Sequence, residues 1–94
     1  MKLLWSPEAL QDRIDIWDHI AADNPLAVAH MDEVFSDGAT RLIEHPKLGL
    51  PGKIPDTREL IVHPNDRLIY EINQDKVWIL TLIHTARLWP PARS

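Results

Sequence analysis

The sequence contains no cysteine, which excludes disulfides and thiolate metal sites and suits a reducing cytoplasm. It also lacks any apolar run near the roughly 18 consecutive residues that a membrane span needs, and its first apolar run is too short for a signal peptide. Glycine is scarce as well, and Gly49 and Gly52 have neither the spacing nor the preceding strand of a phosphate-binding loop. We therefore expect a cytoplasmic protein with no membrane span and no cofactor.

Nucleophilic and metal-dependent chemistry find little support in the sequence. Only two serines precede the C-terminal tail, and we expect Ser6 to cap a helix and Ser36 to lie inside one. Among the five histidines, His19 follows Asp15 by four residues on a predicted helix, but two ligands without a third make a poor metal site. We expect no metal site.

A strong basic excess is also missing. The chain has 94 residues, 45% of them hydrophobic, which predicts one domain over residues 1–94 with a single core. Its net charge is −4, and residues 1–44 hold three basic and nine acidic residues, whereas residues 45–94 hold seven basic and five acidic ones. Nucleic-acid enzymes usually carry a marked basic excess, because phosphate contacts supply most of their affinity. Only the second half of this chain leans that way, and weakly.

The first half of the chain predicts one strand and two helices. Residues 2–5 form a short apolar run, and the sequence SPE at 6–8 is a helix-start signal, since serine caps free N–H groups and proline needs no donor in the first turn. These features predict a strand over 2–5 and a helix over 7–23. The sequence NP at 24–25 repeats the signal and predicts a second helix over 25–44, which would form an antiparallel hairpin with the first.

The second half predicts mainly strands. Residues 45–57 hold three prolines and two glycines, which predicts an irregular surface connection. Three β-rich runs follow over 58–63, 67–72 and 77–84, separated by short polar turns, and they predict an antiparallel meander. In the third run, apolar residues occupy both odd and even positions. We therefore expect a central strand that is covered on both sides over part of its length. Residues 88–94 form a proline-containing tail.

The predicted fold class is therefore α+β with the order β-α-α-β-β-β. A helical hairpin packs on one face of a mainly antiparallel four-stranded sheet, and the other face is open to carry the chemistry of the domain. The first helix has an apolar stripe that we expect to face the core: Leu10, Ile14, Ile16, Trp17, Ile20 and Ala21. Its polar face is acidic and carries Asp12, Asp15, Asp18 and Asp23.

Several residues with catalytic potential fall at or near the predicted strand ends: Arg58, His63, Asp66, Arg67, Tyr70, His84 and Arg87. Cleavage of RNA by its own 2′-hydroxyl needs a base, an acid for the leaving oxygen and cations for the phosphorane charge. In this set, His63 or Asp66 could act as the base and His84 as the acid. The cations would be Arg67 and Arg87.

A purely structural interpretation of the same residues remains open. Arg58 and Arg67 could be solvent-facing partners of Glu59 and Glu71, and Tyr70 could pack as a half-buried core aromatic. Residue types alone favour this interpretation over an active site.

An ordered series of motifs runs along nearly the whole chain: WSPEAL, ADNPLAVAHMDE, EHPKLGLPGKIPDTRELIVHP, RLIYEI and VWILTLIHTARLWP. This series resembles the RelE/ParE superfamily of type II toxin–antitoxin toxins. The resemblance implies a fold of two helices packed on an antiparallel sheet. It also implies a small antitoxin partner that wraps and neutralises the toxin.

The superfamily has two kinds of target, so its fold does not give the function. RelE-like members cut messenger RNA on the ribosome, whereas ParE-like members poison DNA gyrase. Arg67 matches an arginine of the RelE-like pattern, Arg87 falls near its C-terminal basic cluster, and the set of His63, Asp66 and His84 resembles that of the YafQ-like nucleases. The nuclease pattern is incomplete, because no lysine pair precedes the second strand and Trp89, which cannot act as an acid, replaces a tyrosine.

The resemblance to the ParE-like branch is the one that we favour. The DNP helix junction, the long second helix, RELIVHP and the ending IHxxRxWP all match that branch, and a protein target needs no strong basic footprint. We expect a non-enzymatic toxin in which Arg58, Tyr70 and Trp89 contact the target or partner. A basic stretch of the antitoxin would complement the acidic helical hairpin. We expect the chain to form a homodimer or a toxin–antitoxin hetero-oligomer. A non-toxic interaction module is the third interpretation.

Overall fold

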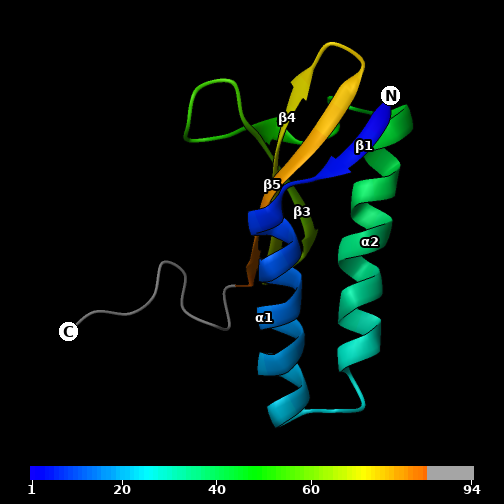
Figure 1. Cartoon of the computed structure of the whole chain (residues 1–94), viewed down its shortest axis with the longest axis vertical. Coiled ribbons are helices and arrows are strands. Elements are labelled where there is room, and N and C mark those ends of the chain that lie inside the picture. The colour runs from blue at the N-terminus through cyan, green and yellow to red at the C-terminus, as the bar shows by residue number, and fades with distance from the viewer. Residues whose placement is uncertain (85–94) are drawn as a thin grey trace, which may run out of the picture.

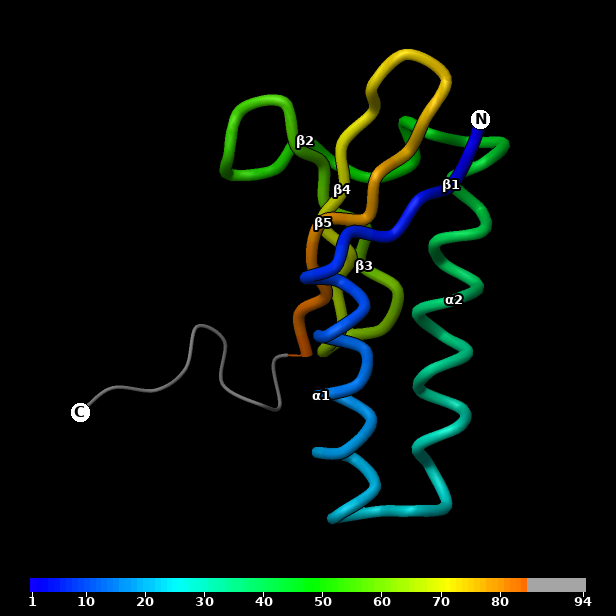
Figure 2. The backbone as a smooth tube through the Cα atoms, in the orientation of Figure 1, coloured from blue at the N-terminus to red at the C-terminus, as the bar shows by residue number. Residues whose placement is uncertain are grey.

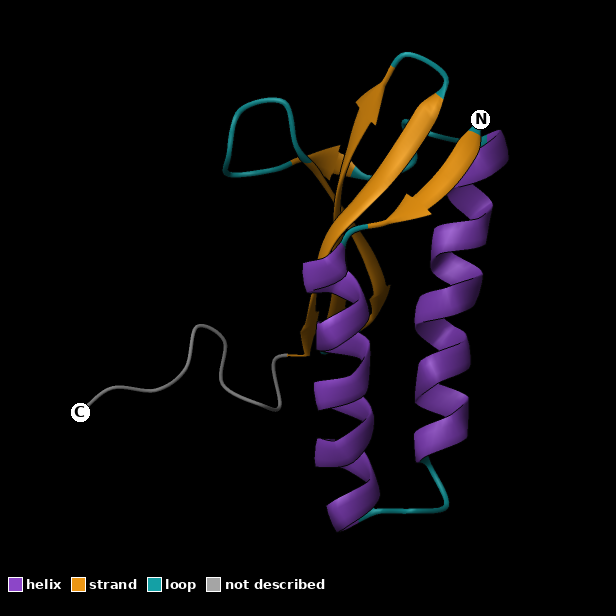
Figure 3. Cartoon of the chain, in the orientation of Figure 1, coloured by secondary structure: helices purple, strands orange, loops and turns teal. Residues whose placement is uncertain are grey.

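The computed structural model of the chain describes residues 1–84, so the predicted tail at 88–94 lies outside the described residues (Figure 1). Its elements are β1 (Lys2–Trp5), α1 (Pro7–Asp23), α2 (Val28–Glu44), β2 (Leu50–Pro51), β3 (Arg58–His63), β4 (Asp66–Asn73) and β5 (Lys76–His84). The sheet order is β1-β5-β4-β3-β2, with β1 parallel to β5 and every other pair antiparallel. The two helices lie on one side of the sheet (Figure 3), which confirms the predicted α+β class.

The sheet has five strands instead of the predicted four. The additional strand is β2, which contains only Leu50 and Pro51 and pairs with Glu59 and Arg58 at the start of β3. Proline is tolerated there because β2 is an edge strand that can leave one backbone position without a donor. The connection that we expected to be an irregular surface segment therefore contributes one short edge strand.

The start of α1 agrees with the prediction to the residue. The Ser6 hydroxyl oxygen accepts the Ala9 N–H at 3.0 Å and, in turn, donates to the Leu80 carbonyl at 2.9 Å. The Ser6 N–H also donates to the Ile79 carbonyl at 2.9 Å. One serine therefore caps the helix and fixes its first turn to β5.

Asp12 does not lie on a solvated polar face as we expected. Its carboxylate accepts the Leu82 N–H at 3.0 Å and the Thr81 hydroxyl at 2.5 Å. β1 pairs with β5 only as far as Ile79, so the backbone beyond that point needs another partner. Asp12 supplies it, and α1 covers the remaining edge of β5.

This attachment sets the rotation of α1 and corrects the predicted core stripe. The buried residues of α1 are Ala9, Ile16 and Ile20. Three other apolar residues that we placed in the core are exposed: Leu10, Ile14 and Trp17. Because Asp12 faces β5, the helix turns its 9/16/20 line toward the core and leaves the 10/14/17 line in solvent.

The start of α2 was predicted wrongly. We expected Asn24 to cap α2 with Pro25 in its first turn, but the Asn24 N–H donates to the Ile20 carbonyl at 2.6 Å and ends α1. Residues 25–27 form a turn, in which Leu26 is 95% exposed, and α2 begins at Val28. The expected antiparallel hairpin of helices is nevertheless present (Figure 1).

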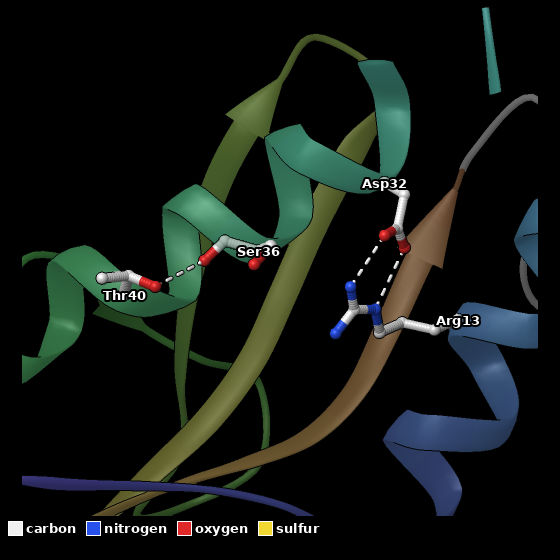
Figure 4. Close-up of polar contacts among 4 residues, drawn as sticks. All are labelled: Arg13, Asp32, Ser36 and Thr40. Atoms are coloured by element: carbon white, nitrogen blue, oxygen red, sulfur yellow. Dashed lines mark hydrogen bonds and ion pairs between the residues drawn. The ribbon is translucent and has the colours of Figure 1, made fainter. Parts of the chain in front are cut away.

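The two helices are joined by one forked ion pair. Arg13 of α1 donates to Asp32 of α2 through Nε at 3.0 Å and through Nη2 at 2.8 Å (Figure 4). The guanidinium carbon also lies 4.8 Å from the ring centroid of Trp5 in β1. This bidentate geometry with an aromatic contact links both helices to the edge of the sheet.

The core lies between the sheet and the helices. Its largest fully buried members are Tyr70, Phe35, Leu42, Leu68, Ile79, Leu82 and Val77, and β5 contributes three of them between its neighbours β1 and β4. This agrees with the predicted central position of the strand, whereas the residues of β5 on its other face are only partly buried. None of the helices in the described part of the chain is long and apolar enough to cross a membrane.

Gly38 allows α2 to lie close against β3. A Cβ atom at this position would collide with the Cγ1 atom of Val62. Alanine normally stabilises a helix by about 1 kcal/mol relative to glycine, but overpacking of this kind costs about 1–3 kcal/mol. The steric term should therefore decide the sign of the effect.

We predict that Gly38→Ala lowers the free energy of unfolding, measured by denaturant titration, and that adding Val62→Ala recovers part of the loss. The second substitution removes the methyl groups that the new Cβ would meet. Asp37→Ala, at an exposed neighbouring position of α2, serves as the control and should change stability by less than about 0.5 kcal/mol. A Gly38→Ala protein as stable as the parent would contradict this account.

Candidate functional site

Strand pairing brings three of the predicted catalytic residues together. Asp66, the first residue of β4, pairs with His63 of β3 on one side and with His84 of β5 on the other. Asp66 Oδ1 forms a short hydrogen bond with His84 Nδ1, and Asp66 Oδ2 lies 3.3 Å from His63 Nδ1. The cluster therefore consists of one carboxylate between two imidazoles.

The three members of this cluster differ sharply in exposure. Asp66 is completely buried, the His84 side chain is 10% exposed and the His63 side chain is 44% exposed. The His84 ring also meets the His19 ring of α1 edge to face, with centroids 6.0 Å apart. A buried carboxylate is costly unless it is paired; His84 hydrogen-bonds Oδ1, whereas Oδ2 has no hydrogen-bond partner within the described structure. Of the two residues considered as the base, only His63 can reach a substrate.

Arg67 lies apart from this cluster. Side chains alternate between the faces of a strand, so Arg67 points away from the helix-facing side on which Asp66 and Leu68 are buried. Its Nη1 atom lies 3.4 Å from Glu59 Oε1. The sheet therefore separates this cation from the imidazoles, and the pairing with Glu59 agrees with the structural interpretation of Arg67. The second predicted cation, Arg87, lies outside the described residues.

Arg58 and Tyr70 hold the chain that follows α2. Tyr70 is fully buried rather than half-buried, and its hydroxyl accepts the Gly49 N–H at 2.9 Å and donates to the Pro46 carbonyl at 2.7 Å. Arg58 donates to the Gly49 carbonyl through Nε at 3.1 Å and to the Lys47 carbonyl through Nη2 at 3.2 Å. Arg58 thus bonds to backbone rather than to a glutamate. Their role in contacting a target stays a prediction, as does that of Trp89, which lies outside the described residues.

The sequence did not single out the exposed apolar side chains. Two groups of them lie on α1 and on the chain after α2, and Leu26 and Ile61 are exposed outside these groups. One is the 10/14/17 line of α1, and the other includes Leu50 and Ile54 after α2. The sequence does contain a sign of the first group, because the apolar stripe of residues 7–23 is too wide for one helix face. Within residues 1–84, no group of three or more histidines and acidic residues is placed to hold a metal ion.

The Tyr70 hydroxyl gives a direct test of how the segment after α2 is anchored. We predict that Tyr70→Phe lowers the free energy of unfolding by about 1–3 kcal/mol, because the Gly49 N–H and the Pro46 carbonyl lose a buried partner. Thr40→Ala is the control, since the Thr40 hydroxyl bonds to the Ser36 carbonyl at 2.9 Å on an exposed helix face (Figure 4). Denaturant titration and amide exchange at Gly49 measure the effect. Equal losses in both variants would refute the anchoring role.

Comparison with known proteins gives a consistent family. Residues 3–89 match the family model described as ParE toxin of type II toxin-antitoxin system, parDE. The chain is 34% identical over 90 residues to Y4kP of Sinorhizobium fredii, which is named as a candidate toxin, with 95% of this chain and 93% of that protein covered. It is 32% identical over 87 residues to toxin RelE2 of Caulobacter vibrioides, covering 93% and 98%.

A solved structure of the chromosomal ParDE toxin–antitoxin system of P. aeruginosa has the same fold. It superposes with a TM-score of 0.81 at 19% identity and covers 89% of this chain and 95% of that chain. The motif series, the architecture and the matched family model agree, and they cover nearly the whole sequence. The chain belongs to the ParE toxin family of type II toxin–antitoxin systems.

Proposed function

We propose that this toxin arrests bacterial growth by binding DNA gyrase in the cytoplasm, as a protein inhibitor without catalytic activity of its own. The observation that carries the proposal is the separation of Arg67 from His63 and Asp66 by the sheet. Cleavage of RNA needs cations beside the acid and base to stabilise the phosphorane. Binding to a protein target has no such requirement.

The overall charge supports the same proposal. The chain carries a net charge of −4, and the arginines of β3 and β4 are engaged with backbone carbonyls and with Glu59. A ligand with a phosphate backbone usually meets free cations. A protein surface can be recognised by apolar contacts instead.

A second candidate function is ribosome-dependent cleavage of messenger RNA, and the pair of His63 and Asp66 favours it. Buried Asp66 lies with Oδ2 3.3 Å from Nδ1 of the partly exposed His63. A carboxylate beside one imidazole nitrogen is a recurring feature of general-base catalysis. Within residues 1–84, the geometry therefore keeps one component of a nuclease without Arg67 beside it.

A gyrase assay and a map of messenger RNA ends together separate these functions. We expect purified toxin to trap cleaved DNA on gyrase or abolish its supercoiling activity, because the proposed target is gyrase itself. The same toxin induced in cells should arrest growth without new messenger RNA 5′ ends in ribosomal A sites. His63→Ala and Arg67→Ala should keep their toxicity, since neither residue has a catalytic task under this proposal.

The opposite pattern of results would show that the toxin is a ribosome-dependent nuclease and not a gyrase inhibitor. That pattern is unchanged gyrase activity at high toxin excess, together with A-site cleavage that His63→Ala abolishes while the protein stays folded. Normal growth after induction of the chain alone would instead favour a non-toxic interaction module. Circular dichroism of each variant shows whether the fold is kept.

The antitoxin partner expected for a member of this family has a matching surface on α1. Leu10, Ile14 and Trp17 form an exposed apolar line, and Ile14 is 54% exposed. Beside it lies a hollow of about 250 Å³ lined by Arg13, Ile14, Trp17, Asp18 and Asp32. An amphipathic antitoxin segment with apolar residues at helical spacing and basic flanks fits this surface.

We predict that Ile14→Asp weakens binding of the cognate antitoxin by about tenfold or more, because buried apolar anchors dominate interface energies. Leu26→Asp is the matched control, since Leu26 is an exposed leucine in the turn between the helices. Titration calorimetry gives the affinities, and size exclusion with light scattering distinguishes a homodimer from a toxin–antitoxin hetero-oligomer. Equal affinity of the Ile14→Asp and Leu26→Asp proteins would exclude α1 as the antitoxin surface.

A further inference from the structure

The segment from Pro46 to Thr57, called here the 46–57 loop, exposes apolar side chains that the core does not use. Leu50 is 70% exposed and Ile54 is 66% exposed, and Leu48 is exposed as well. The tube in Figure 2 shows the part after β2 extending away from the sheet and the helices. Several large apolar side chains grouped on one exposed element usually mark an interaction surface.

The 46–57 loop is held in one shape despite its exposure. Its base is fixed by the hydrogen bonds of Tyr70 and Arg58 to Gly49, Pro46 and Lys47 described above. A Cβ atom at Gly49 would come within 2.7 Å of the Glu59 carbonyl oxygen, so only glycine allows this close approach.

The far part of the loop is closed by its own hydrogen bonds. The Gly52 N–H donates to the Thr57 carbonyl at 2.8 Å, and the buried Thr57 hydroxyl donates to the Ile54 carbonyl at 2.7 Å. Leu50 pairs with Glu59 in the sheet. A loop that is already ordered loses little conformational entropy when it binds.

The charge of the loop differs from that of the helices. Lys47 and Lys53 are exposed, and Asp56 is its one acidic residue, whereas residues 1–44 carry nine acidic and three basic residues. At the base of the loop, an open hollow of about 540 Å³ is lined by His45, Pro46, Lys47 and Leu48. This hollow is open to solvent, so its apolar and basic lining is accessible to a partner.

We infer that the 46–57 loop is the surface through which the toxin contacts its target protein. The target supplies an apolar pocket for Leu50 and Ile54, bordered by aspartate or glutamate side chains that pair with Lys47 and Lys53. This inference rests on the proposed function, because it takes the target to be a protein.

The chemistry of the loop favours a protein over other partners. Two lysines would suit a phosphate backbone, but a backbone of phosphates and sugars offers no pocket for Leu50 and Ile54. The antitoxin segment that fits α1 is basic, and like charges would disfavour its binding beside Lys47 and Lys53. The loop and α1 therefore suit partners of opposite charge.

The test uses the full chain and three variants. Leu50→Asp/Ile54→Asp removes the apolar contacts, Lys53→Glu reverses one charge, and Leu26→Asp introduces an aspartate at an exposed leucine outside the loop. We expect the double variant to inhibit gyrase and growth at least about tenfold less than the parent. Lys53→Glu should weaken both effects by a smaller factor, and Leu26→Asp should act like the parent. All three should keep their binding to the antitoxin.

Two results would overturn the inference. One is full toxicity of both loop variants, and the other is loss of antitoxin binding together with toxicity, which would assign the loop to the antitoxin. If the double variant fails to fold by circular dichroism, Lys53→Glu decides, since Lys53 is exposed and its side chain forms no hydrogen bond or ion pair found in the described structure. If the parent arrests growth but leaves gyrase unaffected, the gyrase proposal fails by itself, and growth arrest by the variants still tests the loop.

Discussion

The unpaired edge of β5 is the constraint on which the helical layer depends. β1 pairs with β5 only as far as Ile79. Buried backbone groups of β5 beyond this residue need other hydrogen-bond partners. Ser6, which caps α1, and Asp12 of α1 meet this need. Their bonds fix the rotation of the helix, which places Ile16 in the core, brings His19 against His84 and leaves Ile14 in solvent. The packing and the candidate antitoxin surface thus follow from the same hydrogen bonds.

Local signals in the sequence were sufficient for some elements and not for others. α1 was predicted over its observed range because the signals at 6–8 act within one turn, and β3 was predicted because its composition and its flanking turn agree. Asn24 misled the prediction because a helix-start signal and a helix end can use the same residue, and its N–H completes α1. β2 escaped prediction because two residues, one of them proline, form a strand only through distant pairing with β3.

The candidate site shows the same limit more strongly. Residue types identified His63, Asp66 and His84, but their contacts arise from the registers of two separate strand pairs. The burial of Asp66 and the opposite orientation of Arg67 follow from those registers and from strand alternation. A sequence can place a histidine, an aspartate and an arginine near one turn without showing that the sheet lies between them.

The two exposed surfaces give a physical condition for neutralisation. An antitoxin segment bound along acidic α1 leaves the lysine-bearing 46–57 loop uncovered unless the antitoxin chain continues across the domain. The longest dimension of the structure is 39 Å, and an extended chain advances about 3.3 Å per residue. An extended stretch of about 12 residues therefore equals the longest dimension of the domain in length. Because the opposite charges of the two surfaces would require such an extension to change from basic to acidic, a wholly basic segment bound to α1 leaves the loop uncovered.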